Sequence, residues 1–217
     1  MSRPDDRAAE FASFVVRLER RLLGPLPGLA AQLAMAPRPR RARPPPGIDP
    51  SRPIPAAVLA LLFPGGEPCL VLTRRTDRVE THKGQICLPG GAVDRDETPI
   101  EAALREADEE IGVARAAVRI VGALTPIFIP VSGFRMEPFV AVTDRRPDFR
   151  AAASEVDEVI EVPLSRLRDP RLRGERRALR DGHPVVVPYF EIGQKHVWGA
   201  TAMVLAELCA LLDDVVA

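Results

Sequence analysis

The stretch 90–113, GGAVDRDETPIEAALREADEEIGV, constrains the fold of this chain more than any other. Thr98 precedes Pro99, a residue favoured at the first position of a helix. Glu101 follows Thr98 at the spacing of a capping box. Gly112 is suited to end the same helix, because glycine readily takes the left-handed conformation of a C-terminal cap. The sequence therefore predicts a helix that begins at Pro99 and stops before Gly112.

Three acids of this helix, Glu106, Glu109 and Glu110, stand at i, i+3 and i+4 and therefore share one face. Like charges on one face repel each other, and the negative end of the helix dipole is a poor place for acids. Mg²⁺ and Mn²⁺ favour carboxylate oxygens, so the arrangement suits a hard divalent cation. The alternative is a solvated acidic face on a surface helix, and these three residues alone leave both interpretations open.

The neighbouring residues favour the metal interpretation. Gly90 and Gly91 allow the backbone to approach other groups closely. Glu97 falls in the loop before the helix. Arg105 lies within the run of acids, where it can brace that loop or pair with a carboxylate.

With these neighbours included, the stretch resembles the Nudix box, G-x5-E-x7-R-E-U-x-E-E-x-G-U, where U is apolar. The matching residues are Gly91, Glu97, Arg105, Glu106, Glu109, Glu110 and Gly112, with Ala107 and Val113 at the apolar positions. The resemblance implies a Nudix-type α-β-α sandwich and hydrolysis of a nucleoside diphosphate linked to another group. It implies that Glu106, Glu109 and Glu110 ligate Mg²⁺ or Mn²⁺. Glu97 would ligate or support the ions, and Arg105 would hold the geometry of the loop and helix.

Residues 70–91 resemble a second signature, that of the coenzyme A pyrophosphatase subgroup, roughly L-L-T-x-R-S/A-x3-R-x3-G-x3-F-P-G-G. The matching residues are Leu72, Thr73, Arg75, Gly84, Pro89, Gly90 and Gly91. Thr76 replaces the usual Ser or Ala, Glu80 stands where Arg is usual, and Leu88 stands where Phe is usual. The resemblance implies hydrolysis of coenzyme A or acyl-CoA to 3′,5′-ADP and 4′-phosphopantetheine or its acyl form.

The partner implied by this signature is a small-molecule nucleotide. We expect it to contact Arg75, His82, Lys83, Gly90 and Gly91, although a lone loop histidine is more often structural or merely exposed. The departures at positions 80 and 88 leave open another Nudix substrate, such as ADP-ribose or a nucleoside triphosphate. A nucleotide-binding regulatory module with little activity is a further alternative, which the intact set of acids disfavours.

Hydrolysis of a phosphoanhydride also needs a base that takes a proton from water. Glu109 or Glu110 can serve within the metal site, and the downstream loop ASEVDEV offers Glu155 as the first choice and Glu158 as the second. The alternative for that loop is a solvated turn before a strand. We therefore predict Glu109, Glu110, Arg105 and Glu155 as the catalytic residues.

The rest of the chain predicts an α+β domain over residues 54–217, with a mixed sheet and a C-terminal helix. IPAAVLALLF and CLVLTRR flank the turn PGGEP and predict a β-hairpin, and Asp181-Gly182-His183 predicts a second hairpin turn. Apolar residues recur at helical spacing before residue 34, and a Pro/Arg-rich arm follows them. Residues 1–53 are thus predicted as an N-terminal helical extension and an arm. The extension is either a disordered tail or a helix packed on the domain or on a second copy, which would make a homodimer.

Composition excludes several functional classes. Lys+Arg and Asp+Glu number 30 each, and the basic arm lacks aromatic residues, so nucleic-acid binding is not expected. Three dispersed cysteines argue against a disulfide framework and favour free thiols in a reducing compartment. No apolar run is long enough to span a bilayer. We therefore expect a soluble, cytoplasmic protein without a membrane partner.

Overall fold

The computed structural model describes residues 4–40, 44–77 and 84–216. The helices are α1 (Pro4–Leu22), α2 (Gly28–Leu33), α3 (Pro99–Ile111), α4 (Leu164–Arg168) and α5 (Gly199–Val216), with 3-10 turns η1 (Arg115–Ala117) and η2 (Pro170–Leu172). The strands are β1 (Ile54–Pro64), β2 (Pro68–Arg75), β3 (Ile86–Cys87), β4 (Gly90–Ala92), β5 (Arg119–Ala123), β6 (Ile127–Ile129), β7 (Phe134–Val142), β8 (Val156–Pro163), β9 (Arg173–Arg180), β10 (His183–Ile192) and β11 (Lys195–Trp198).

The main sheet is mixed, as predicted. Its central order is β3-β2-β1-β7-β5, and β4, β6 and β8 pair with β1, β7 and β2. β1 runs parallel to β7, whereas β1 and β2 form the predicted antiparallel hairpin. β1 is buried on both faces because alternate side chains enter different cores. Leu59 and Leu61 enter the core beneath α3, and Ala60 and Leu62 enter the core shared with α1 and α5.

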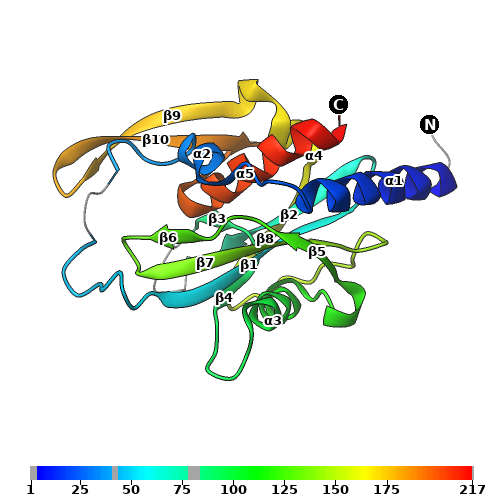
Figure 1. Cartoon of the computed structure of the whole chain (residues 1–217), viewed down its shortest axis with the longest axis horizontal. Helices are drawn as coiled ribbons and strands as arrows, with labels where there is room; N and C mark the ends of the chain where they lie inside the picture. The colour runs from blue at the N-terminus through cyan, green and yellow to red at the C-terminus, as the bar shows by residue number, and fades with distance from the viewer. Residues whose placement is uncertain (1–3, 41–43, 78–83, 217) are drawn as a thin grey trace.

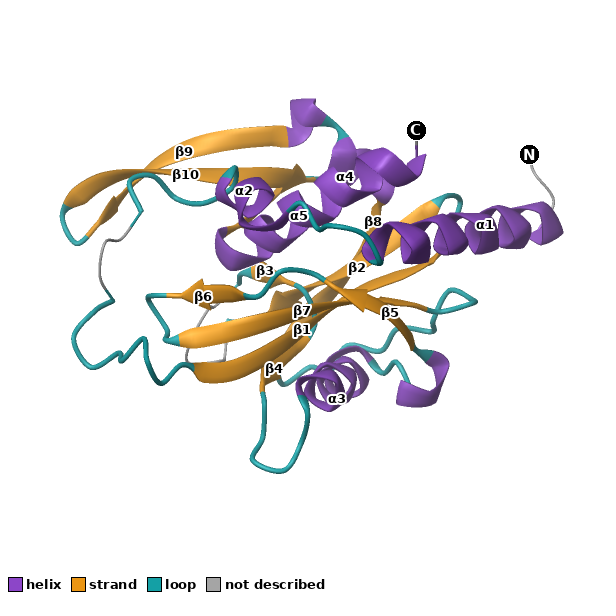
Figure 2. Ribbon diagram, in the orientation of Figure 1, coloured by secondary structure: helices purple, strands orange, loops and turns teal. Residues whose placement is uncertain are grey.

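Helices cover both faces of this sheet, as Figures 1 and 2 show: α3 lies on one face, and α1 and α5 lie on the other. The α+β sandwich with an N-terminal helix therefore matches the predicted fold class. Among the described residues, no helix is both long enough and apolar enough to cross a membrane.

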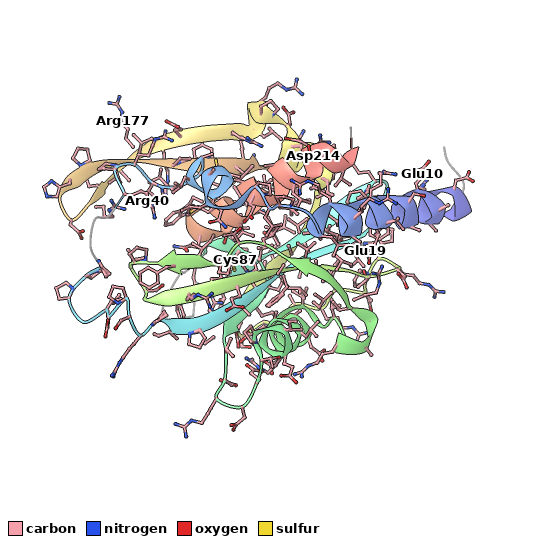
Figure 3. The ribbon with its side chains drawn as sticks, viewed as in Figure 1. Glu10, Glu19, Arg40, Cys87, Arg177 and Asp214 are labelled. Carbon is pink, nitrogen blue, oxygen red and sulfur yellow. The ribbon has the colours of Figure 1, made fainter. Side chains whose placement is uncertain are left out.

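The N-terminal helix packs on the domain. Phe11, Phe14 and Leu18 are buried in the same cluster as the apolar residues of α5. At the rim of this contact Arg21 Nε lies 2.7 Å from Asp214 Oδ2. Glu19, labelled with Asp214 in Figure 3, pairs with Arg119 of β5. Of the alternatives raised by the sequence, packing on the domain is the one observed.

A buried carboxylate on α5 accepts hydrogen bonds from α2 and so links the two helices. Glu207 is fully buried and accepts hydrogen bonds from Gln32 Nε2 at 2.7 Å, Thr125 Oγ1 at 2.7 Å and Gly28 N at 3.1 Å. Such a carboxylate tolerates burial only when donors replace its water. No local sequence pattern indicates this contact, because its donors come from segments far apart in the chain.

β9, β10 and β11 form a separate antiparallel sheet beyond α5, which the sequence analysis did not anticipate. The predicted hairpin turn between β9 and β10 is present. Asp181 and Gly182 take φ of 53° and 77°, as a tight turn with two left-handed residues requires. The arm joins this sheet through backbone hydrogen bonds between Arg38 and Val186.

Candidate functional site

Helix α3 has the ends that the sequence predicts. Thr98 Oγ1 accepts from Glu101 N at 3.3 Å, while Thr98 N donates to Glu101 Oε2 at 2.7 Å, which completes the capping box. Gly112 closes the helix with φ of 68°. Its N–H and that of Val113 return to carbonyls of the last turn. These caps fix where the acidic residues stand along the helix.

Arg105 connects the loop before α3 to the acids of the helix. Its Nε and Nη2 donate to the two oxygens of Glu97 at 3.1 and 2.7 Å. Its Nη1 donates to Glu106 Oε1 at 2.9 Å and to Glu109 Oε2 at 3.0 Å. Nη2 also reaches the carbonyl of Ala92 at 3.2 Å. One guanidinium therefore pairs with three of the predicted site acids and braces the loop.

Glu97 is held by this contact on both oxygens. Glu97 Oε1 also accepts from the backbone N–H of Asp94 at 2.9 Å. The hydrogen bonds from Arg105 and then from Asp94 lower the pKa of Glu97 to about 2. Glu97 is therefore ionised throughout the physiological range and is placed as a brace for the loop.

Glu106 lies against the backbone of Gly91. A Cβ atom at residue 91 would come within 2.3 Å of Glu106 Oε1 and 2.6 Å of its Cδ. A side chain at residue 91 would therefore have to displace the end of the Glu106 side chain, which agrees with the close backbone approach expected at this pair of glycines. Burial raises the pKa of Glu106, against the lowering effect of Arg105.

Glu110 is the most buried of the acids, at 2% exposure. Burial, and then repulsion from Glu106, raise its pKa to about 8, although Arg75 and the N–H of Gly90 oppose this shift. Arg75 Nη1 lies 3.6 Å from Glu110 Oε1. Glu110 Oε2 and Arg75 Nε are buried without a hydrogen-bond partner among the residues that the structure describes. The sequence predicts a substrate contact for Arg75 and carries no signal for its contact with Glu110.

The loop that carries Glu155 docks on the C-terminal end of α3. Ala152 N donates to the carbonyl of Glu110 at 3.0 Å, and Arg150 N donates to that of Ile111 at 2.9 Å. These bonds satisfy carbonyls that a helix end leaves free. Glu155 is exposed and near enough to raise the pKa of both Glu106 and Glu110 electrostatically.

Glu158, the second choice for the base, is placed differently. Its Oε1 accepts from Lys195 Nζ at 2.8 Å. Glu158 pairs in register with Arg74 on β2. Leu70 and Leu72, on the same face of β2 as Arg74, enter the core shared with α5. The structure thus brings Glu155, and not Glu158, to the acids of α3.

The donor chemistry of the site fits a divalent cation. Glu106 and Glu110 are partly desolvated, repel each other, and include an oxygen without a partner in the described chain. These features favour a bound cation with oxygen ligands. Within residues 4–40, 44–77 and 84–216, however, no three His, Cys, Asp or Glu side chains are gathered as a ready cage. Glu109 instead faces Arg105 in this arrangement.

The second signature lies beside these acids. Gly90 has φ of 149°, and a Cβ there would come within 2.3 Å of the carbonyl of Ala57. Cys87, labelled in Figure 3, is a free thiol on β3, and burial raises its pKa to about 11, with smaller and opposite effects from the charges of Glu110 and Arg75. Leu88 is buried at 2% exposure in the core shared with α5. Three residues singled out by sequence, Glu80, His82 and Lys83, lie outside the described residues.

Comparison with known proteins points to one family. The family model described as the NUDIX domain matches residues 53–181. The uncharacterized Nudix hydrolase NudL of Escherichia coli K12 is 39% identical over 158 residues, which cover 70% of this chain and 80% of that protein. The Nudix hydrolase RenU of M. smegmatis gives a TM-score of 0.49 at 19% identity, over 74% of this chain and 86% of that one. DR0079 of Deinococcus radiodurans gives a TM-score of 0.47 at 20% identity, over 72% and 85% of the two chains.

Proposed function

This chain belongs to the Nudix hydrolase family and is a pyrophosphohydrolase, and on that premise we propose that it cleaves the pyrophosphate of coenzyme A or an acyl-CoA. The products are 3′,5′-ADP and 4′-phosphopantetheine or its acyl form. The two alternatives kept beside this proposal are another nucleoside diphosphate derivative, such as ADP-ribose, and a nucleoside triphosphate.

The observation that carries the proposal is the junction of the two signatures at Glu110. Arg75, from the coenzyme A signature, lies 3.6 Å from this carboxylate, and Gly90 contributes a backbone hydrogen bond to it. The signature residues therefore line the same site as the acids of the Nudix box. This supports a shared role in binding one phosphoanhydride.

The replacement of the usual Phe by Leu88 does not argue against coenzyme A as the substrate. Leu88 replaces the usual Phe but is buried within the core. The change from Phe to Leu therefore alters the packing of the core, because a buried side chain does not face a substrate that binds from solvent. The charge reversal at Glu80 is the remaining feature that favours ADP-ribose or another nucleotide.

Nudix hydrolases generally use divalent metal ions, typically Mg²⁺ or Mn²⁺. We assign Glu106, Glu109 and Glu110 as the residues that hold such ions, with Glu97 supporting them through Arg105. The ions supply neutralisation of the phosphate charge and acidify water.

The chain's own residues supply positioning and a proton acceptor. Glu155 takes the proton from the attacking water, whose oxygen forms the new bond to phosphorus as the bond to the bridging oxygen breaks. The loop that docks on α3 sets the place of Glu155. Arg75, with its buried Nε, contacts a phosphate oxygen through charge-assisted hydrogen bonds.

The remaining substrate contacts are proposed from the signature. Gly90 and Gly91 carry no side chain that would cover their backbone, so the pyrophosphate can approach it closely. His82 and Lys83 contact the nucleotide, with Lys83 as a cation for phosphate. Arg74 is less suited to this role, since it already pairs with Asp157 at 3.3 Å.

The test is to incubate the pure chain with Mg²⁺ or Mn²⁺ and coenzyme A, 3′-dephospho-coenzyme A, ADP-ribose or a nucleoside triphosphate. Separation of the products by chromatography should show 3′,5′-ADP released from coenzyme A in preference to the other cleavages. Preferred cleavage of ADP-ribose or the triphosphate would select an alternative. No cleavage of any of them would favour a binding module.

A further inference from the structure

Arg105 makes more contacts than a brace for the loop requires. Two of its nitrogens, Nε and Nη2, already hold Glu97 on both oxygens. Its third nitrogen, Nη1, bridges Glu106 Oε1 at 2.9 Å and Glu109 Oε2 at 3.0 Å. The contacts of Arg105 with Glu106 and Glu109 on α3 are therefore made by a different nitrogen from its contacts with Glu97 in the loop.

The helix contacts involve oxygens that a divalent ion needs. Glu109 is turned toward Arg105, and the described part of the chain has no three acids assembled as a cage. The side chain of Glu109 is 60% exposed, so it is free to rotate away from the guanidinium. Glu110 Oε2, buried and without a hydrogen-bond partner in the same described part, is an oxygen that a divalent cation could use as a ligand.

We propose that Arg105 is an internal counter-ion that competes with the divalent cation for Glu109 and Glu106. Binding of the cation transfers these carboxylates from Nη1 to the ion, while Glu97 retains the guanidinium beside the site. This inference rests on the proposed metal site and adds that the metal-free site is held closed by Arg105.

The opposite role for Arg105 is orientation, in which it holds the carboxylates ready for the ion. The two roles predict couplings of opposite sign between Arg105 and the cation. If Arg105 competes, its removal leaves the carboxylates to repel each other and strengthens cation binding. If it orients them, its removal weakens cation binding.

The experiment measures Mn²⁺ affinity without substrate, by titration followed by the rise in thermal unfolding temperature and by paramagnetic resonance of free Mn²⁺. The variants are Arg105→Gln and Arg105→Lys. The single nitrogen of the lysine cannot replace the contacts of Arg105 with Glu97, Glu106 and Glu109. The matched control is Arg171→Gln, since Arg171 holds Asp169 with two nitrogens on the exposed surface. We expect ~5-fold or tighter Mn²⁺ binding in Arg105→Gln, a smaller gain in Arg105→Lys, and no change in the control.

Weaker or unchanged Mn²⁺ binding in both Arg105 variants would overturn the proposal. A variant that folds only when Mn²⁺ is present is the extreme form of the expected result, because the ion then replaces the guanidinium. A variant that stays unfolded at saturating Mn²⁺ argues against the exchange. Because no substrate is used, a wrong assignment of coenzyme A leaves this result unaffected.

Discussion

At its N-terminal end α3 carries a capping box and an N1 proline, whereas its last turn has Asp108, Glu109 and Glu110 and no basic residue. The first end follows the rules that stabilise helices. The second end breaks the rule that the helix dipole sets for charge. Under the proposed function, the first turn serves the fold and the last turn serves the chemistry.

The cost at the C-terminal end is offset from outside the last turn. Arg105 neutralises Glu109 at 3.0 Å, and Arg75 lies 3.6 Å from Glu110. The docked loop supplies donors to the carbonyls of Glu110 and Ile111. Each compensating group also lies at the site, so stability and function share the same residues there.

The substitution Glu110→Gln should separate the effect of this residue on stability from its effect on turnover most strongly. It keeps the shape of the side chain and removes the proton uptake that folding requires of Glu110 at neutral pH, so the metal-free protein should gain at least about 1 kcal/mol there. Turnover should fall by ~10³-fold, as for loss of a charged group that stabilises the transition state. Urea unfolding with a chelator and a product assay measure the two effects. A variant that loses stability, or retains near-normal turnover, would contradict this division of roles.

Glu155→Gln tests the docked loop. If Glu155 is the base, turnover should fall by ~10²–10⁴-fold while Mn²⁺ affinity and unfolding temperature change little. Glu158→Gln is the matched control from the same segment, because Glu158 pairs with Lys195 and not with the site. A loss of only a few-fold in Glu155→Gln, or an equal loss in both variants, would remove Glu155 from this role.

A pH series sharpens the contrast between Glu110 and Glu97 in the metal-free protein. Glu110 has its pKa raised from 4.5 to about 8, so between these values the folded chain holds a proton that the unfolded chain releases. Its contribution to the free energy of unfolding is therefore lost as pH rises, by at most ~1.4 kcal/mol per pH unit. Glu97 has its pKa lowered to about 2 and acts in the opposite sense, with stability lost only as pH falls below about 4.5.

The measurement is the difference in urea unfolding between the wild type and Glu110→Gln from pH 5 to 8, with a chelator present. Other titrating groups contribute equally to both proteins, so the difference isolates Glu110. We expect the advantage of the variant to grow with pH across this window. Parallel curves would show that Glu110 titrates outside it.

Gly91→Ala should damage the site through contact alone. The added Cβ would meet Glu106 Oε1 at 2.3 Å, so the carboxylate or the β4 backbone must move. Because the atom in contact is the end of a flexible side chain, the loss of stability should lie at or below the lower end of the ~1–3 kcal/mol typical of overpacking, and the displaced carboxylate should bind Mn²⁺ more weakly. Gly66→Ala is the control, since a Cβ there meets nothing within 4 Å. Equal effects of the two substitutions would mean that the tight contact at Gly91 is unimportant.

The features that could be predicted from the sequence are those that depend on residues close together in the chain. Local signals predicted α3 with both caps, the hairpin of β1 and β2, and the turn at Asp181, because each depends on residues close in the chain. Strand order was not accessible in this way. Nothing near β9 indicates that it leaves the main sheet with β10 and β11.

The site shows a similar limit. The spacing of Glu106, Glu109 and Glu110 was visible because helix geometry alone brings them together. The contact of Arg75 with Glu110 joins β2 to α3 and depends on how the layers pack. The five hydrogen bonds to Glu207 come from α2 and the loop after β5, and the sequence of α5 around this acid does not specify them.

Thr98→Ala should give the smallest effect, because it changes only the end of α3 that serves the fold. It removes the oxygen that accepts from Glu101 N, and loss of an N-cap costs ~1 kcal/mol. Turnover at saturating substrate should remain near that of the wild type, since the acids lie on later turns. Ser13→Ala is the control, a hydroxyl within α1 that bonds its own helix at 2.9 Å and whose loss should be nearly neutral. A large loss of turnover in Thr98→Ala, without a matching loss of stability, would show that the capped end also positions the acids and that the division between the two ends of α3 is incomplete.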